Sequence, residues 1–298
     1  MSGERRSGEE RQALAAKFRL PWADGISTLC KFRGFQDQSR EWVSQILLES
    51  KIYFSHPDDF NDPFDVAPVY RLAGKSSDRA FARVMRREDL RGHLNRGRTR
   101  QQVRELRRQE GVPLEKLAES VIETSRRDLR NGARILCLSS NCTDPLQWSH
   151  YANGHQGLCI HFKSDEGTWA GGARGVAYRK GRSAIRIPLS TQSEWRMVDL
   201  MALTKAHFWR YEREYRVIAP LRRPDHCITL RDNFYHFAPS DITGVTVGLR
   251  MSADDRRELA RVLQQRRQAV EAFECIEDHA RFALKIRPVD PARWLPRM

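Results

Sequence analysis

The chain has 298 residues, of which 40% are hydrophobic and 30% charged, and its formal net charge is +14. This length allows one large domain or two smaller ones, and the charge favours polyanionic partners such as nucleic acid, nucleotides or an acidic neutralising protein. No apolar run reaches the ~18 residues of a membrane span, and the opening MSGERRSGEERQ has no apolar secretory signal, so we expect a cytoplasmic protein.

The cysteines do not form paired C-x-x-C motifs, so we expect no structural zinc site and instead predict buried free thiols. They stand at Cys30, Cys137, Cys142, Cys159, Cys227 and Cys275. The sequence also lacks the glycine-rich GxxxxGK[ST] and GxGxxG loops, which excludes ordinary P-loop and Rossmann chemistry.

The chain opens with a predicted tail at 1–27 that contains one short helix near 12–18. A strand is predicted at 28–33, where Lys31 and Arg33 alternate with apolar residues. Residues 42–47 carry a helical apolar stripe, and a second strand follows at 51–55.

The second strand runs into an acidic loop, and together they read KIYFSHPDDFNDPFD (51–65). Pro57 and Pro63 end regular structure there. The loop crowds Asn61 together with Asp58, Asp59, Asp62 and Asp65. Taken alone, it is most simply an Asx-type turn held by flanking phenylalanines.

A basic helical insertion is predicted at 71–133. Residues 71–134 contain 18 Lys and Arg against 9 Asp and Glu, and apolar residues recur there at helical spacing. Arginines along helices suit phosphate binding, and solvated helix faces are the alternative. The arginines expected to contact nucleic acid are Arg86, Arg87, Arg98, Arg100, Arg107 and Arg108.

The second half of the chain alternates between predicted strands and helices. Strands are predicted at 134–140, 158–162, 176–178, 214–218, 227–230, 242–249, 272–276 and 282–286. Helices are predicted from Asp144-Pro145 to 152, at 190–208, and at 252–268 with Ser252 as N-cap. The sequence therefore predicts a single α/β domain at 28–290 with a central mixed β-sheet.

One segment of this half, WRYEREYRVI (209–218), places Glu214 at the head of a strand. Alternation puts Tyr215 and Val217 on one face, and Glu214 with Arg216 on the other. Glu214 is therefore either a functional carboxylate or one half of a structural Glu–Arg pair, and both interpretations stay open.

Six stretches together resemble one bacterial family, known as domain of unknown function 2971. They are LCKFR (29–33), KIYFSHPDDFNDPFD (51–65), CLSSN (137–141), WSHYANGHQGLCIHF (148–162), WRYEREYRVI (209–218) and ITGVTVGLRMSADDR (242–256). They occur in the family's order and cover most of residues 28–256.

A weaker resemblance is to ADP-ribosyltransferases of the toxin and phage-defence type, which use NAD as a substrate. In that fold a first strand supplies a basic residue or His to NAD, a second presents Tyr or Ser near nicotinamide, and a later one carries a catalytic Glu. Lys31 or Arg33, then Tyr53 with Ser55, then Glu214 stand in this order, although the first strand carries no His.

The resemblance implies roles for these and neighbouring residues. Glu214 would stabilise charge at the ribose, Glu212 would activate the acceptor, and Tyr53 or Tyr151 would stack on the nicotinamide. The residues expected to bind NAD are Lys31, Arg33, Ser55, Asn61, Asp62, His150 and Tyr151.

Two alternatives remain. His150 and His155, with Asp62 or Asp65, could bind a metal ion and support nuclease-like hydrolysis. The protein could also be a non-enzymatic, basic nucleic-acid-binding module in which the acidic loop and the YERE segment are ion-pair scaffolding.

Overall fold

The computed structural model of this chain describes residues 8–72, 123, 127, 130–187, 200–221 and 227–296. The six arginines expected to contact nucleic acid, and most of the predicted basic insertion, lie outside the described residues. The chain forms two compact units. Unit 1 comprises residues 1–59, 133–178 and 207–298, and unit 2 comprises residues 60–132 and 179–206.

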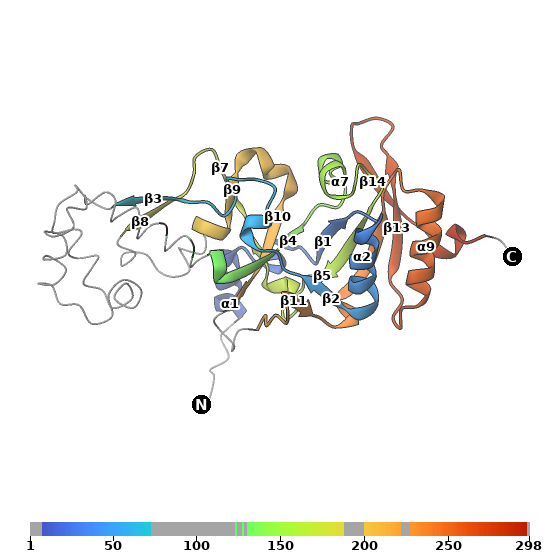
Figure 1. The fold of residues 1–298 in the computed structure, drawn as a ribbon, viewed down its shortest axis with the longest axis horizontal. Coiled ribbons are helices and arrows are strands. Elements are labelled where there is room, and N and C mark those ends of the chain that lie inside the picture. Colours follow the sequence, from blue (N-terminus) through green and yellow to red (C-terminus); the bar gives the residue numbers. More distant parts are fainter. Residues whose placement is uncertain are drawn as a thin grey trace, which may run out of the picture. The chain divides into compact units, whose positions relative to one another are not determined.

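Unit 1 is built on an eight-stranded sheet with the strand order β14-β13-β12-β5-β1-β4-β10-β6 (Figure 1). The strands are β1 (Thr28–Arg33), β4 (Ala133–Ser139), β5 (Leu158–Lys163), β6 (Arg174–Gly175), β10 (Glu214–Pro220), β12 (Ile242–Val247), β13 (Glu271–Glu277) and β14 (Leu284–Pro288). Strands β12 and β13 are parallel, and the other neighbours in this sheet are antiparallel. The predicted mixed α/β architecture with a central mixed sheet is confirmed.

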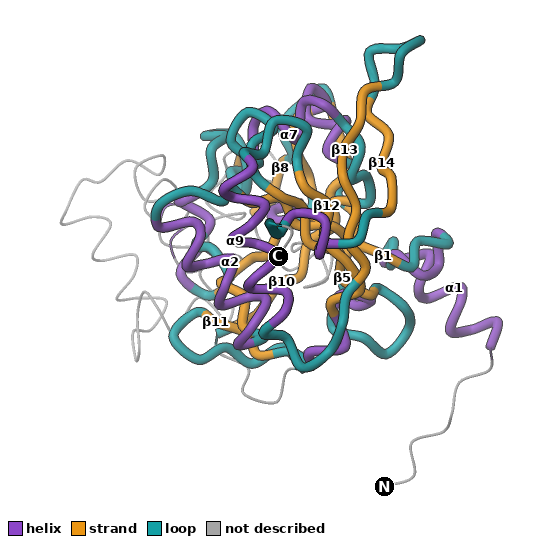
Figure 2. Tube along the Cα trace, turned by 90° about the vertical axis from the view of Figure 1, so that its right-hand side faces the viewer, coloured by secondary structure: helices purple, strands orange, loops and turns teal. Residues whose placement is uncertain are grey.

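The two faces of this sheet are covered by different helices. Helices α2 (Gln38–Glu49) and α9 (Ala253–Gln264) lie side by side and pack their apolar residues against one face (Figure 2). Helix α7 (Pro145–Tyr151) packs Trp148 against the other face. Successive residues of a strand point to opposite faces, so Leu29 joins the first core and Cys30 joins the second.

Two helix starts follow from the sequence as predicted. The Ser252 hydroxyl accepts the backbone N–H of Asp255 at 3.0 Å, which caps α9. The Asp144 carboxylate accepts the N–H of Leu146 at 2.9 Å, which caps α7 ahead of Pro145. Both caps satisfy donors that have no partner inside the helix.

The other elements of unit 1 are short, except for the N-terminal helix. They are α1 (Gly8–Phe18), η1 (Pro21–Asp24), η2 (Pro57–Asp59), η3 (Ala170–Gly172), η5 (His207–Glu212), η6 (Pro239–Asp241) and η7 (Pro291–Trp294), with the antiparallel pair β2 (Lys51–Tyr53) and β11 (Phe234–His236). Strand β7 (Ala177–Arg179) follows β6. In unit 2, β3 (Val69–Leu72) pairs in parallel with β8 (Ala184–Ile187), and β9 (Thr204–Ala206) precedes η5.

Two predicted elements are corrected. The helix predicted at 190–208 is wrong at its end, because residues 204–206 form β9 and the 3-10 turn η5 follows. Lys205 lies on this strand and is buried against Asp65, an arrangement set by packing rather than by helical periodicity. The strand predicted at 227–230 is absent. A nearby strand that was not predicted, β11, forms further along the chain and pairs with β2.

Among the described residues, no helix is both long and apolar enough to span a membrane.

Candidate functional site

The register of three neighbouring strands brings distant polar residues together in unit 1. On β10, Glu214 lies opposite Ser139 of β4, and Arg216 lies opposite Cys137. Strands β1 and β4 are joined by a single residue pair, Cys30 with Ser139. The hydrogen-bond ladder between them therefore opens beyond this pair, toward the end of β1 that carries Lys31.

Lys31 lies at this opening between β1 and β4. Its Nζ donates a hydrogen bond to the carbonyl oxygen of Cys137 at 2.8 Å, in place of a backbone donor. Burial, followed by the Arg33 cation, lowers the pKa of Lys31 to about 7, and the carboxylates of Glu214 and Glu212 offset part of that shift. Burial also lowers the pKa of Arg33 to about 10. This end of β1 therefore presents two partly desolvated basic side chains, of which Lys31 lies within electrostatic reach of two carboxylates.

Glu214 forms an ion pair with Arg216 on the same face of β10. The Arg216 Nε and Nη2 atoms donate to the two carboxylate oxygens at 2.7 and 3.0 Å, and Arg216 is 0% exposed. A guanidinium buried to this degree requires a matched anion. The expected Glu–Arg pair is present, and it fixes the orientation of the Glu214 carboxylate.

Glu212 is the second buried carboxylate, at the end of η5. Its Oε1 accepts a hydrogen bond from the Tyr151 hydroxyl at 2.5 Å, and its carbonyl oxygen accepts one from the Ser139 hydroxyl at 2.6 Å. Tyr151 is the last residue of α7, so this contact links the short helix to the turn ahead of β10. A neutral hydroxyl thus contacts the Glu212 carboxylate, whereas a guanidinium contacts the carboxylate of Glu214.

An aromatic cluster lies beside Glu212 and consists of His150, Tyr151, Trp209 and Tyr211. The ring centroid of His150 is 6.3 Å from that of Trp209 and 6.4 Å from that of Tyr211. The sequence predicted His150 and Tyr151 as site residues but missed Trp209 and Tyr211. Their spacing in WRYE, two residues apart directly before Glu212, was the available signal.

The structure does not place Tyr53 or Ser55 beside Glu214. Tyr53 lies on β2, which pairs with β11, and its ring packs against Phe234 at 5.4 Å between centroids. Ser55 pairs with Ile135 of β4. The partner of Glu214 on β4 is Ser139, four residues further on, which is about 13 Å along a strand.

Asn61 and Asp62 belong to unit 2, in the acidic loop. The Asp62 carboxylate accepts the N–H of Phe64 at 2.9 Å, which is the expected Asx-type turn. Asp65 is buried and lies 3.6 Å from the Nζ of Lys205. The lining of a cavity of about 220 Å³ in this unit includes four basic residues, Arg179, Lys180, Arg182 and Lys205. Asp62 and Asp65 thus serve turn and ion-pair roles within unit 2.

The histidine-based metal site gains no support from the geometry. Among the described residues, the potential ligands close enough to share a metal ion are Cys30, Cys159 and His161. Neither His150 nor His155 belongs to that group. Burial and the nearby Arg250 cation lower the pKa of His155.

Comparison with known proteins found no match among protein families, curated proteins or solved structures. The functional argument therefore depends on the site in unit 1.

Proposed function

We propose that the protein is an ADP-ribosyltransferase-like enzyme that cleaves NAD and transfers ADP-ribose to a nucleic acid, nucleotide or protein. One observation carries this proposal. The cation of Lys31 on β1 lies within electrostatic reach of two buried carboxylates, Glu212 and Glu214, that are far away in the sequence. A cation that can hold pyrophosphate and a carboxylate that can act at the ribose are the parts this reaction requires.

The residues around Lys31 and the two glutamates fit the chemical groups of NAD. Lys31 and Arg33 would contact the pyrophosphate, because an approaching dianion restores the charged form of a lysine whose pKa has fallen to about 7. The exposed ring of His150, with Trp209 beside it, offers a stacking surface for nicotinamide or adenine. This surface takes the role that the sequence had assigned to Tyr53.

The reaction breaks the bond between the ribose carbon and the nicotinamide nitrogen, and the bonding electrons leave with nicotinamide. Positive charge then develops on the ribose, where Glu214, held in orientation by Arg216, would stabilise it. A nucleophilic oxygen or nitrogen of the acceptor forms the new bond to the ribose carbon. Glu212 would receive the proton that the acceptor loses.

The test is nicotinamide release from NAD by the purified full chain, alone and with added DNA, RNA or cell lysate. Glu212→Gln keeps an oxygen that can accept the Tyr151 hydrogen bond, so it removes the charge with little structural change. We expect release to fall by about 100-fold or more in Glu212→Gln and in Glu214→Gln. Release should stay unchanged in Glu277→Gln, which alters an exposed glutamate on β13.

Thermal unfolding of each variant separates a lost reaction from a lost fold, since Glu214→Gln leaves Arg216 buried beside a neutral amide. If the wild-type chain releases nicotinamide and a folded Glu212→Gln variant releases it equally well, the proton transfer belongs to another group. If no addition elicits release from the wild-type chain, the proposal is wrong.

A further inference from the structure

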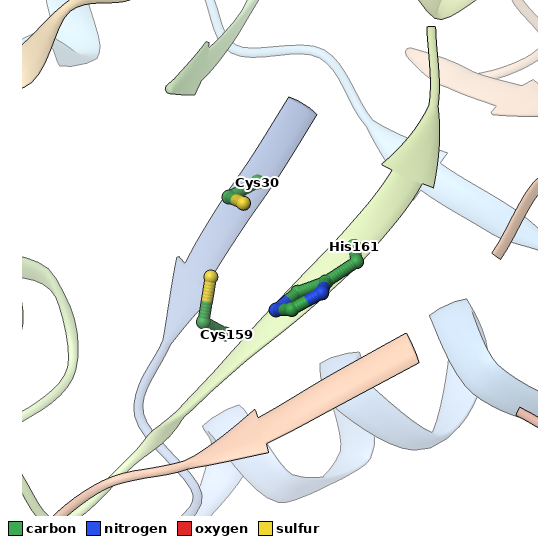
Figure 3. Close-up of side chains that lie close together, drawn as sticks. All are labelled: Cys30, Cys159 and His161. Carbon is green, nitrogen blue, oxygen red and sulfur yellow. The ribbon is translucent and has the colours of Figure 1, made fainter. Parts of the chain in front are cut away.

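Three potential metal ligands meet on one face of the sheet in unit 1. Cys30 of β1 lies directly opposite His161 of β5, and Cys159 precedes His161 by two residues on the same strand. All three side chains therefore point to the face covered by α7. Their ligand atoms lie within 4.8 Å of one another, and Figure 3 shows them gathered on the two neighbouring strands.

A fourth cysteine packs beside them. Cys142 contacts the cluster of buried residues that contains Cys30 and Cys159. Cys142 lies in the loop between β4 and α7, and its carbonyl oxygen accepts the Trp148 Nε1–H at 2.8 Å. This bond holds the loop over the cluster and leaves the Cys142 side chain half-buried next to Cys30.

The spacing fits a shared metal ion better than a disulfide between β1 and β5. Cys30 and Cys159 are diagonal neighbours on antiparallel strands, whose Cβ atoms lie well beyond the ~4 Å of a disulfide. Two sulfur atoms on one tetrahedral zinc ion lie about 3.8 Å apart, because each Zn–S bond is about 2.3 Å. Side chains gathered within 4.8 Å reach that geometry with small rotations.

The apolar surroundings favour thiolates bound to a metal ion over free thiolates. The cluster is enclosed by apolar groups that include Phe32, Trp148 and Leu284. Three thiolates on one divalent ion leave a single negative charge, so the complex suits such a site better than three free thiolates do.

A neighbouring strand supplies an orienting group. The Thr246 hydroxyl of β12 lies 2.9 Å from the His161 Nε2, and the His161 ring stacks on Phe273 of β13 with its centroid 5.7 Å away. These contacts restrict the rotation of the ring.

We propose that Cys30, Cys159 and His161, completed by Cys142, bind one zinc ion in a tetrahedral Cys₃His site. The ion would tie β1 and β5 to the loop that precedes α7. Lys31 follows Cys30 on β1, and Tyr151 ends α7, so the ion would also hold the two sides of the candidate site together.

The test measures metal in the full-length chain purified under reducing conditions. Elemental analysis should find one zinc ion per chain, and X-ray absorption at the zinc edge should show mainly sulfur with one nitrogen neighbour. Cobalt(II) added to the metal-free chain should give the intense visible absorption of a tetrahedral thiolate site. Cys30→Ser and Cys159→Ala should lose both signals, whereas Cys227→Ser, at the exposed cysteine, should keep them.

The proposal is independent of NAD chemistry, because every readout reports on metal. Zinc with only oxygen and nitrogen neighbours would overturn it, and so would zinc that persists in a folded double variant Cys30→Ser/Cys159→Ala. A wild-type chain that stays free of metal and gives no cobalt spectrum after reconstitution would overturn it even if both variants fail to fold.

Discussion

At the residue scale, Lys31 offers the sharpest pH-dependent prediction. Its pKa is about 7 in the folded chain and 10.5 in its ordinary state. Between these values the unfolded chain binds the extra proton, so stability rises with pH across this window. The unfavourable effect of the buried charge is complete below pH 7 and fades toward pH 10.5.

Replacing Lys31 with Met should therefore stabilise the fold at pH 6, by on the order of 2 kcal/mol after the lost hydrogen bond to Cys137 is discounted. The gain should shrink toward pH 10, while nicotinamide release is lost. Chemical unfolding at several pH values measures this change. Lys163→Met, at an exposed lysine of β5, serves as the control and should show no such pH trend. A Lys31→Met chain that is less stable at pH 6 would show that the lysine is structural.

At the element scale, Gly157 sets the close approach of the turn before β5 to the end of β1. A Cβ atom at this position would lie 2.1 Å from the carbonyl oxygen of Arg33, a backbone atom that cannot rotate away. Gly157→Ala should thus push β5 from β1 and destabilise the fold by on the order of 2 kcal/mol or more.

Gly172→Ala is the matched control, since a Cβ there meets no atom within 4 Å. Differential scanning calorimetry should show a lower unfolding temperature for Gly157→Ala and a nearly unchanged one for Gly172→Ala. Equal unfolding temperatures for the two variants would contradict the close approach of the two strands.

At the scale of the whole molecule, the net charge of +14 predicts binding to polyanions. We expect affinity for a DNA or RNA duplex to fall steeply with salt, because binding releases counterions from the phosphates.

Arg107→Gln/Arg108→Gln should weaken binding and reduce the slope of log K against log salt by roughly two. Arg257→Gln/Arg261→Gln on α9 removes the same charge elsewhere. Fluorescence anisotropy measures both, and equal effects would mean that net charge alone decides binding.

The alternation of apolar and polar residues along the sequence predicted much of the sheet in unit 1. Alternation in 28–33 and 214–218 located β1 and β10, because each strand has one face in the core. The same rule put Glu214 and Arg216 on one face, where they form their ion pair. The rule failed at 227–230, since alternation does not tell whether a neighbouring strand is available to pair.

The site itself was predicted in part. Glu212, Glu214, Lys31, His150 and Tyr151 were all named from the sequence. Tyr53 and Ser55 were assigned to the same place from strand order, but strand order does not specify which strands become neighbours. The cysteines were expected to be scattered thiols, because a spacing rule detects ligands only when they are close in sequence.

The sequence by itself determined where most strands of the main sheet lie, where α7 and α9 begin, and how strongly basic the chain is, because these depend on neighbouring residues and on composition. The tertiary structure alone decided that Lys31 lies within electrostatic reach of two glutamates, that Tyr53 lies elsewhere, and that Cys30 lies opposite His161. These outcomes depend on sheet order and register, which arise from the packing of the whole core.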